Sequence, residues 1–237
     1  MKNSGLFPSF FIFDDMKTEL LFKHFLRHRL VTTDTRKITQ NAIFFALKGE
    51  KFNGNLFAKE ALDKGASIVV VDEPQNLQDD RIILVKNGLE SLQALARAYR
   101  STLRIPVIGL TGSNGKTTSK ELIAAVLQEK FQVHYTQGNL NNHIGVPLTL
   151  LSIPENAQIA VIEMGANHLK EIELLSSIAQ PDLGYVTNFG HAHLEGFGGF
   201  EGVVKGKSEL YNFLYEHHKT VLINADDPLQ LQQAKAV

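Results

Sequence analysis

Residues 105–118, IPVIGLTGSNGKTT, carry the pattern that decides the fold: an apolar run, a glycine-rich turn, and a lysine with two threonines opening an amphipathic segment. This order is typical of a phosphate-binding loop. A buried strand leads to the turn, glycine lets the backbone approach an anion closely, and the free amides at the start of the helix face that anion. The stretch therefore predicts a nucleotide-binding strand, loop and helix.

The glycine spacing is shorter than in the commonest phosphate-binding loop. The pattern G-x-x-x-x-G-K-[ST] requires glycine at position 110, where this chain has Leu110. A compact T-G-x-x-G-K-T form describes the stretch better. Lys116 is then predicted to neutralise the β- and γ-phosphates, and the Thr117 hydroxyl to bind Mg²⁺. The alternative is a glycine-rich turn without a ligand, and the order of strand, turn, Lys-Thr and helix argues against it.

Length and composition limit the class of protein. With 237 residues, 43% of them hydrophobic, the chain can form two modest domains. A net charge of −1 provides no general field for nucleic acid, and the absence of cysteine excludes disulfides and thiolate zinc sites. The apolar residues 6–13 are interrupted by Pro8 and lack the basic flank of a signal peptide, and no run has membrane-spanning length. We expect a cytoplasmic protein without membrane insertion.

The chain alternates helix-like and strand-like segments, which indicates an α/β fold in two parts. A small α/β domain is expected over residues 1–103, with a polar link at residues 100–104. From residue 104 to 237 a second set of continuous apolar strands predicts a mainly parallel sheet with helices on both faces. This second domain is expected to be incomplete, because the chain stops soon after NADDP at 224–228.

Ligands of parallel sheets collect at the carboxyl ends of the strands, and Thr111, Glu163 and Asn188 lie at such ends. Glu163 ends the apolar run QIAVIE and can supply a hard oxygen ligand to Mg²⁺. A solvated strand end is the plainer interpretation of that glutamate. Residues alone leave both open.

Three further segments carry side chains suited to chemistry. The segment TNFGHAHLEGFGGF (187–200) places His191, His193 and Glu195 in a loop after a strand, where an imidazole can bind a metal or phosphate or simply face solvent. The asparagines of GNLNNHIGVPLTLL (138–151) can cap a helix or contact a substrate. Lys205 and Lys207 of VVKGKSEL begin a helical stretch. A lysine there is ordinarily solvated, but one near two metal ions can be carbamylated.

Together these segments resemble the Mur ligase family of peptidoglycan synthesis. TGSNGKTT is similar to its compact ATP loop, VIEMGANHLKEI to its metal-binding strand end, TNFGHAHLEGFG to its histidine loop, and KGKSEL to its carbamylated-lysine segment. TTDTR (32–36) and residues 42–66 are similar to the UDP-binding domain of the two later ligases of the pathway. GNLNNHIGVPLTLL and EMGANH are more similar to the ligase that adds D-alanyl-D-alanine than to the one that adds the third residue.

The resemblance implies a role for each matching residue. It implies that Thr117 and Glu163 bind one Mg²⁺, while His193 binds a second with carbamylated Lys207; His193 is preferred to His191 because Leu194 and Glu195 follow it. Catalytic roles are implied for Lys116, His193 and Lys207. The residues implied to contact ATP are Thr111, Gly112, Ser113, Asn114, Gly115, Lys116, Thr117 and Thr118. Those implied to contact the UDP-muramoyl peptide are Thr35, Arg36, Asn141, Asn142, Asn167 and His168. The departure at FNGN (52–55), where related sequences often carry an acid and a histidine, leaves the uridine contacts open.

The activity implied by the resemblance is ATP-dependent amide ligation through an acyl phosphate. The implied substrates are ATP, UDP-N-acetylmuramoyl-tripeptide and D-alanyl-D-alanine, and a monomer is expected. The alternatives are the sister ligase that adds lysine or diaminopimelate, more remotely a folylpolyglutamate synthase, or a nucleotide-binding fragment without catalysis. The family has a third domain that completes the ATP site, and we expect this chain to lack it and to be inactive alone.

Overall fold

The computed structural model describes residues 16–235, and the apolar stretch 6–13 considered above lies outside the described residues. The chain divides into two compact units between Tyr99 and Arg100. Both units are built from parallel strands and helices, so the predicted α/β class is confirmed.

The first unit contains a four-stranded parallel sheet with the strand order β1-β2-β5-β6. Its central strands read as uninterrupted apolar runs, IFF and IVVV, and all seven of these residues are buried. Such runs are typical of strands covered on both faces. The four strands are β1 (Val31–Thr32), β2 (Ile43–Phe45), β5 (Ile68–Val71) and β6 (Ile82–Leu84).

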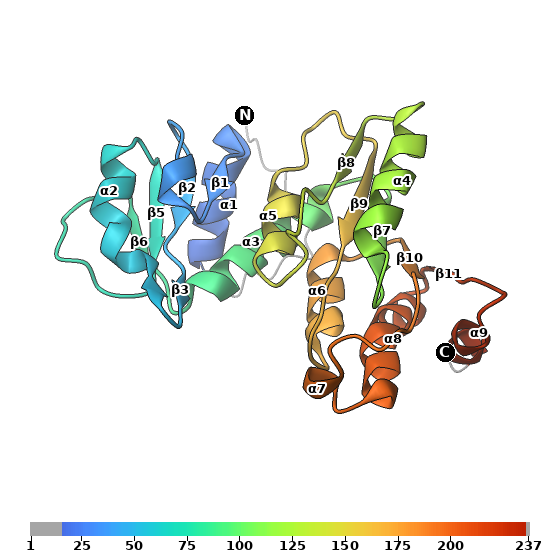
Figure 1. Ribbon diagram of the computed structural model, residues 1–237. Helices are drawn as coiled ribbons and strands as arrows, with labels where there is room; N and C mark the ends of the chain where they lie inside the picture. The colour runs from blue at the N-terminus through green and yellow to red at the C-terminus, as the bar shows by residue number, and fades with distance from the viewer. Residues whose placement is uncertain (1–15, 236–237) are drawn as a thin grey trace. The chain divides into compact units, whose positions relative to one another are not determined.

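Helices cover both faces of this sheet, with α2 on one side of the strands and α1 on the other (Figure 1). Because side chains alternate along a strand, Phe44 and Val69 share the face that packs against Ala61 of α2. Phe25 of α1 and Tyr99 of α3 meet edge to face, with their ring centroids 4.9 Å apart. These helices are α1 (Met16–His28), α2 (Ala58–Asp63) and α3 (Gly88–Thr102).

Short elements follow β1 and β2 in the first unit. The residues of KGEKFN form a small antiparallel hairpin, and single helical turns occupy TRK and GNLF. The elements are η1 (Thr35–Lys37), β3 (Lys48–Gly49), β4 (Phe52–Asn53) and η2 (Gly54–Phe57).

The polar link predicted at residues 100–104 is wrong at its start, because α3 continues through Thr102. Arg100 is buried, and its guanidinium donates to the carbonyl oxygens of Ala179 (2.9 Å) and Gln180 (2.7 Å) and to Asp182 Oδ2 (2.8 Å). A buried guanidinium needs such partners, since an unpaired one carries a large desolvation cost. These bonds extend the ordered helix beyond the point where polar composition suggested a loop.

The second unit contains a five-stranded parallel sheet with the strand order β11-β10-β7-β9-β8. The first strand of the set, β7, therefore lies in the centre, and later strands are added on both sides of it. In open parallel sheets, ligands bind beside the carboxyl end at such a switch in strand order. The strands are β7 (Val107–Thr111), β8 (Val133–Tyr135), β9 (Ile159–Glu163), β10 (Leu183–Val186) and β11 (Thr220–Leu222).

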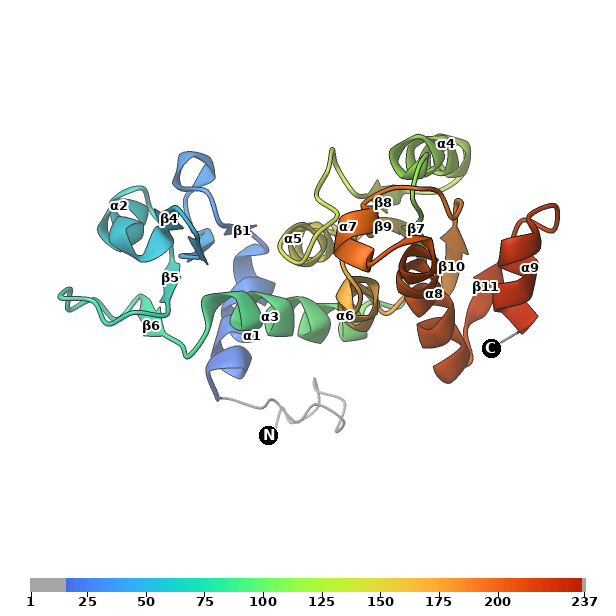
Figure 2. The same ribbon diagram turned by 60° about the horizontal axis from the view of Figure 1, so that its bottom comes forward.

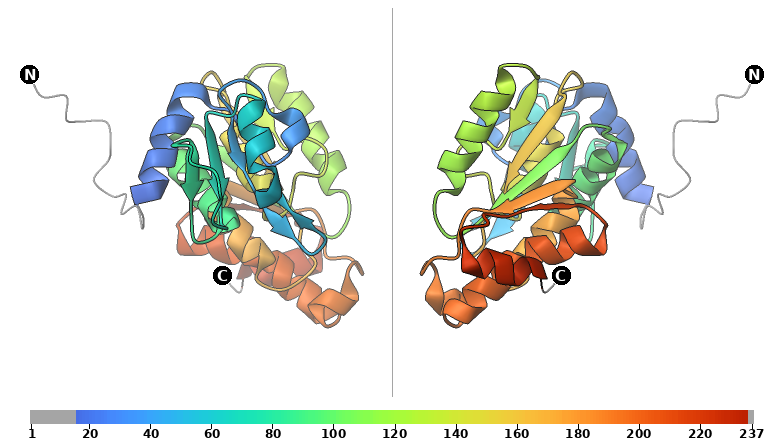
Figure 3. Two further views of the ribbon diagram at one scale, coloured as in Figure 1. Left: turned by 90° about the vertical axis from the view of Figure 1, so that its left-hand side faces the viewer. Right: turned by 90° about the vertical axis from the view of Figure 1, so that its right-hand side faces the viewer.

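Helix α4 covers one face of this sheet, and α6 and α8 cover the other (Figure 2). The last helix, α9, lies beside α8 (Figure 3). Within residues 16–235, no helix is both long enough and apolar enough to cross a membrane. The helices are α4 (Lys116–Gln128), α5 (Gly145–Leu151), α6 (Glu171–Ala179), α7 (Leu194–Phe197), α8 (Phe200–Glu216) and α9 (Pro228–Lys235).

Candidate nucleotide and ligase site

The glycine-rich loop joins the carboxyl end of β7 to the start of α4, as the sequence pattern predicts. Gly112 has φ +142°, and a Cβ at this position would lie 2.0 Å from Thr187 Oγ1. Gly115 has φ +75°, and no atom of residues 16–235 lies within 4 Å of the position of its Cβ. Gly112 is thus required by the close approach of β10's end, whereas Gly115 is required only by its left-handed backbone.

The segment after β10 holds this loop in shape. Asn188 accepts the Ser113 amide through its backbone oxygen (3.1 Å) and the Asn114 amide through Oδ1 (3.1 Å). Thr187 Oγ1 donates to the carbonyl oxygen of Asn114 at 2.7 Å. Two of the loop amides expected to face phosphate are therefore engaged by Asn188, and the first amides of α4 are the groups that the helix itself leaves available.

Lys116 folds back over its own loop. Its ammonium donates to the carbonyl oxygens of Gly112 (2.8 Å) and Ser113 (3.2 Å). Burial lowers the pKa of Lys116, and the charge of Glu163 partly opposes that shift. The loop thus keeps a half-buried cation at its centre, beside the start of α4.

Glu163, at the end of β9, is buried and lies at the meeting point of three segments. Its Oε1 accepts from Asn141 Nδ2 (2.8 Å) and from Thr117 Oγ1 (3.3 Å). Its backbone amide donates to Thr136 Oγ1 at 2.9 Å. The sequence left open the interpretation that Glu163 is a solvated strand end. Because the carboxylate is buried, that interpretation is wrong.

The asparagine loop, residues 138–142, lies ahead of α5. One of its asparagines caps the helix, and another contacts Glu163 instead. Asn142 Oδ1 accepts the amides of Ile144 (3.1 Å) and Gly145 (2.9 Å), so it supports the start of α5. Asn141 instead directs its amide to Glu163 and accepts the Gly165 amide through its backbone oxygen at 2.7 Å. The loop is thereby tied to the end of β9.

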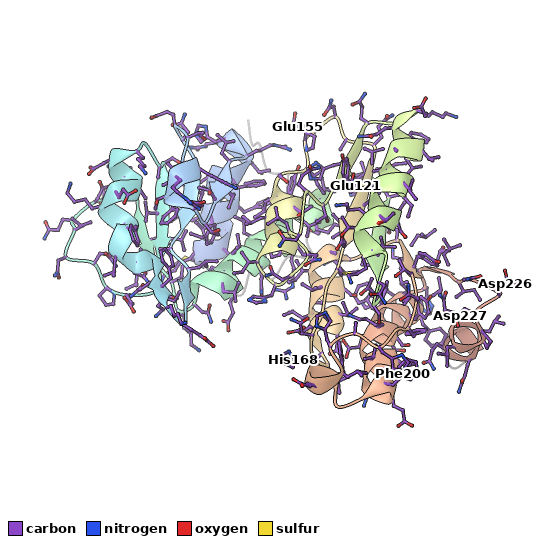
Figure 4. All side chains as sticks on the ribbon, in the orientation of Figure 1. Glu121, Glu155, His168, Phe200, Asp226 and Asp227 are labelled. Carbon is purple, nitrogen blue, oxygen red and sulfur yellow. The ribbon has the colours of Figure 1, made fainter. Side chains whose placement is uncertain are left out.

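Asn167 and His168 form the entry to α6. The amides of Asn167 (2.6 Å) and His168 (3.1 Å) donate to Glu171 Oε2. A Cβ on Gly196 would lie 2.2 Å from the Asn167 carbonyl oxygen, so the first turn of α7 rests on this segment. Figure 4 shows His168 beside that short helix.

The histidine segment is not wholly a loop, because residues 194–197 form α7. His193 precedes this helix with φ +55°. The ring of His191 stacks on that of Phe200, with a centroid separation of 4.7 Å. His191 thus has a packing partner, and His193 faces a cavity described below.

Lys207 is almost fully buried in α8, whereas Lys205 is exposed. The Lys207 ammonium donates to the Ala166 carbonyl oxygen (3.0 Å) and lies 5.1 Å from the centroid of the Phe197 ring. Burial, with a further contribution from the charge of Lys116, lowers the pKa of Lys207 to about 8. A substantial fraction of this amine is therefore neutral near physiological pH.

A cavity of about 460 Å³ brings several of the predicted residues together. Its lining includes Lys116, Asn141, Asn142, Asn167 and His193. Thr117, Glu163 and Lys207 do not line it, although Glu163 bonds to the lining residue Asn141, Lys207 bonds to the lining residue Ala166, and Thr117 bonds to Glu163. Within residues 16–235 no three acidic or histidine side chains form a ready-made metal cluster.

Thr35 and Arg36 lie in the first unit, along a separate cavity of about 440 Å³. Arg36 forms a bidentate pair with Asp34, with Nε–Oδ1 at 2.9 Å and Nη2–Oδ2 at 2.8 Å. Phe52 and Phe57, which also line this cavity, stack with ring centroids 5.4 Å apart.

At the FNGN departure, the second asparagine has a structural role. Asn55 is buried; its Nδ2 donates to Asp72 Oδ1 (2.8 Å), and its Oδ1 accepts from the backbone amide of Asp72 (3.0 Å).

A larger cavity, of about 950 Å³, lies at the opposite edge of the second sheet. It includes Asp182 and Lys219, which precede β10 and β11 and so mark the amino ends of the strands. Its charges pair with one another, since Asp182 binds both Arg100 (2.8 Å) and Lys219 (2.7 Å). The larger volume of this cavity therefore does not identify it as the nucleotide site, which is marked instead by the phosphate loop.

The sequence motifs missed Lys120 and Thr136, which both contact Glu163: Lys120 of α4 lies near its carboxylate, and Thr136, just after β8, accepts its backbone amide. No local motif distinguishes either residue, because their partners come from distant segments.

Curated relatives are similar to this chain in sequence. The chain is 47% identical over 206 residues to the UDP-N-acetylmuramoyl-tripeptide--D-alanyl-D-alanine ligase of Bacillus subtilis, a match that covers 86% of this chain and 45% of that protein. It is 44% identical over 197 residues to the Escherichia coli protein of the same name, covering 83% and 43%. The chain thus spans somewhat less than half the length of the curated relatives it matches.

Solved structures of similarly named ligases resemble this chain in fold. The MurF ligase of Thermotoga maritima in complex with ADP superposes with a TM-score of 0.81 at 34% identity, covering 88% of this chain and 48% of that one. Residues 28–110 match the model described as Mur ligase family, catalytic domain, and residues 110–237 match the Mur ligase middle domain. The second match alone covers more than half of the sequence. The chain therefore belongs to the Mur ligase family.

Proposed function

We propose that this chain carries the nucleotide site and the UDP-substrate site of an ATP-dependent ligase that joins D-alanyl-D-alanine to UDP-N-acetylmuramoyl-tripeptide. The observation that carries the proposal is the compact phosphate loop beside buried Glu163, in a chain 47% identical to a protein of that name. The ADP complex of the related MurF supports nucleotide binding. The sister ligase that adds the third residue is the alternative, and the names of the relatives favour D-alanyl-D-alanine.

The two parts of the chain take different substrates in this proposal. Residues 1–103 hold the uridine diphosphate end, where the diphosphate exchanges with Asp34 for the Arg36 guanidinium and the stacked rings of Phe52 and Phe57 offer apolar faces. Residues 104–237 hold ATP and the muramoyl peptide, the latter beside the asparagines that line the cavity of about 460 Å³ and beside His168, which follows the lining residue Asn167.

Lys116 and the start of α4 bind the phosphates. The Lys116 ammonium, now on the carbonyl oxygens of Gly112 and Ser113, exchanges those neutral acceptors for phosphate oxygens. Anionic acceptors form stronger hydrogen bonds with an ammonium than carbonyl oxygens do. The amides at the start of α4 add donors and the positive end of the helix dipole.

Glu163 and Thr117 suit a Mg²⁺ ion. Both offer hard oxygen atoms, and within the described residues Glu163 Oε2 is buried without a hydrogen-bond partner. The Lys120 ammonium lies 3.8 Å from this oxygen, too far for a hydrogen bond, so a metal ion at the buried oxygen would offset a desolvation cost that remains. Bound there, Mg²⁺ would offset the negative charge of the phosphates.

His193 and Lys207 suit a second ion if Lys207 is carbamylated. The Lys207 amine is buried and has a pKa of about 8, so it has a neutral form able to attack carbon dioxide. Its nitrogen bonds to the carbon of CO₂ and loses a proton, which leaves an anionic carbamate with oxygen atoms suited to Mg²⁺.

The proposed reaction has two steps. An oxygen of the peptide carboxylate attacks the γ-phosphorus of ATP, the bond to the β,γ-bridging oxygen breaks, and an acyl phosphate and ADP form. The amine of D-alanyl-D-alanine then attacks the acyl carbon, and the tetrahedral intermediate expels phosphate after losing a proton. Lys116 and the helix amides stabilise charge on the transferred phosphoryl group, while the asparagines orient the peptide.

The experiment separates binding from ligation. Affinities of this chain for Mg·ATP and for UDP-N-acetylmuramoyl-tripeptide are measured by calorimetry, each ligand alone. Phosphate release and product formation are then measured with the tripeptide and D-alanyl-D-alanine and, for the sister reaction, with the UDP-linked dipeptide and lysine or diaminopimelate, on this chain and on a chimera carrying the remainder of the Bacillus subtilis relative. Binding of neither ligand, or a preference for lysine or diaminopimelate, would contradict the proposal.

A further inference from the structure

Lys120 is fully buried in α4, on the helix face that packs against the sheet. It lies one helical turn after Lys116 and one before Ala124, also buried, so the three share a stripe that faces inward. An apolar residue is the usual occupant of such a position, and lysine is almost never fully buried unless it is paired. The partners of Lys120 therefore explain its presence.

The first partner is Glu163. The Lys120 ammonium lies 3.8 Å from Glu163 Oε2, the oxygen that makes no hydrogen bond within the described residues. The other oxygen, Oε1, is held by Asn141 and Thr117. Lys120 is thus the cation that faces Oε2, the carboxylate oxygen without a hydrogen-bond donor among the described residues. It approaches Glu163 from the core.

The second partner is the asparagine loop. The Lys120 ammonium lies 3.5 Å from the carbonyl oxygen of Gly138, a residue with φ +55° that opens the loop. It also lies 5.8 Å from the centroid of the Tyr135 ring at the end of β8 and 3.0 Å from Oε1 of half-exposed Glu121. One buried charge therefore joins α4, the loop at 137–142 and the end of β9.

We propose that Lys120 is a positioning residue that couples the nucleotide loop to the asparagine loop, by fixing both Glu163 and the Gly138 carbonyl from within the core. It touches neither proposed substrate. Its effect passes through the direction of the Glu163 carboxylate and the shape of residues 138–142, which lie on the nucleotide and peptide sides of the site. The inference concerns the same site as the proposed function and rests on it for the identity of the ligands.

The first test needs no ligand. Backbone amide exchange of residues 138–142 is measured by mass spectrometry in the wild type, in Lys120→Met, which removes the ammonium and keeps the stem, and in the control Lys130→Met, which removes an exposed lysine just beyond α4. We expect exchange to rise about tenfold in Lys120→Met, as loss of one buried contact worth roughly 1.4 kcal/mol would give. The control should match the wild type, and an unchanged rate in Lys120→Met would overturn the coupling.

The second test uses Mn²⁺ with ADP, read by electron paramagnetic resonance of free Mn²⁺. We expect Lys120→Met to weaken Mn·ADP binding about tenfold or more while ADP affinity in EDTA stays within about twofold, since the ion contacts the displaced carboxylate. Lys120→Arg, which restores the charge, should recover part of that loss. Equal losses with and without the ion would show a merely structural role and sink the idea.

If Lys120→Met does not fold, a double variant that removes both buried charges still tests the inference. Glu163→Gln combined with Lys120→Met leaves no unpaired buried charge, and its Mn·ADP affinity should equal that of Glu163→Gln alone, because Lys120 acts on the ion through Glu163. Additive losses would contradict this. If the wild type binds no Mn·ADP, the proposed function fails, and the exchange experiment still decides the role of Lys120.

Discussion

The side-chain amide of Asn141 donates to Glu163 Oε1 across 2.8 Å and so joins the asparagine loop to the carboxyl end of β9. The two residues are separated by 22 positions in the sequence. Because Thr117 Oγ1 approaches the same oxygen at 3.3 Å, one buried carboxylate oxygen connects the loop, the strand and the nucleotide helix. Several experiments can be designed around this junction.

Asn141→Ala should destabilise the second unit. It removes the closest hydrogen-bond donor of a buried carboxylate oxygen, and such a loss costs roughly 1–3 kcal/mol of unfolding free energy. Urea denaturation followed by circular dichroism measures the change. Asn139→Ala is the matched control, since Asn139 is exposed in the same loop, and it should stay within about 0.5 kcal/mol of the wild type. Equal effects of the two variants would show that the Asn141 bond contributes nothing.

Lys116→Ala should abolish ATP-dependent ligation in the complete enzyme and weaken Mg·ATP binding by this chain at least tenfold, because the cation of the phosphate loop is lost. The fold should be retained, since Lys116 bonds only carbonyl oxygens of its own loop in the structure. Calorimetry and circular dichroism check the two statements. Undiminished affinity would remove Lys116 from the nucleotide site.

Gly112→Ala and Gly115→Ala should differ in their cost to stability. Both have a left-handed φ, for which a non-glycine residue costs about 1–2 kcal/mol. Of the two, and within the part of the chain that the structure describes, only position 112 would also bring the new Cβ against another atom, Thr187 Oγ1 at 2.0 Å. Gly112→Ala should therefore lower the free energy of unfolding more, and its loss should shrink when it is combined with Thr187→Ala. An equal loss at both positions would contradict the close approach.

Lys207 should form a carbamate and Lys205 should not, because Lys207 is buried with a pKa lowered to about 8, whereas Lys205 is exposed. With ¹³C-labelled bicarbonate, a carbamate carbon resonance should be present in the wild type and in Lys205→Met, and absent in Lys207→Met. At fixed carbon dioxide pressure, and while most of the lysine is unmodified, the signal should grow by about fiftyfold between pH 7 and pH 8, because the neutral fraction rises from about a tenth to a half and each carbamate formed releases one proton.

Chemical rescue gives an independent check of the carbamate. Lys207→Ala in the complete enzyme should regain part of its ligase activity with small carboxylates such as acetate or formate, which can occupy the space of the lost anion. The same salts should have no such effect on Lys116→Ala. A carbamate signal that survives in Lys207→Met, or the failure of every rescuing anion, would count against this role.

The sequence predicted those features that depend on contiguous residues. The run of β7, turn and α4 follows from apolar periodicity, two glycines and a Lys-Thr pair within one short segment, and the structure agrees. The parallel sheets follow from unbroken apolar runs such as IVVV at 68–71. The helical extension through Thr102 could not be foreseen, because it depends on Arg100 reaching carbonyl oxygens about 80 positions later.

The sequence predicted the motif residues of the candidate site in the same way, because each motif is a short contiguous segment. Lys116, Asn141, Asn167 and His193 line one cavity, yet their roles toward ligands stay predictions. Lys120 reads in the sequence as a helical surface lysine, and only tertiary packing reveals its burial. Patterns of spacing identify the groups of a motif, whereas the residues that hold them come from distant parts of the chain.

The dependence of the phosphate loop on Asn188 also has a consequence in time. The Asn114 amide and the Asn188 side chain that accepts it are 74 positions apart. At about 5–20 residues per second, a ribosome needs roughly 4–15 s to add the residues between them. Throughout that interval the nascent chain carries the complete nucleotide motif without the bonds that shape it. The loop therefore matures only after β10 and Asn188 have emerged and docked.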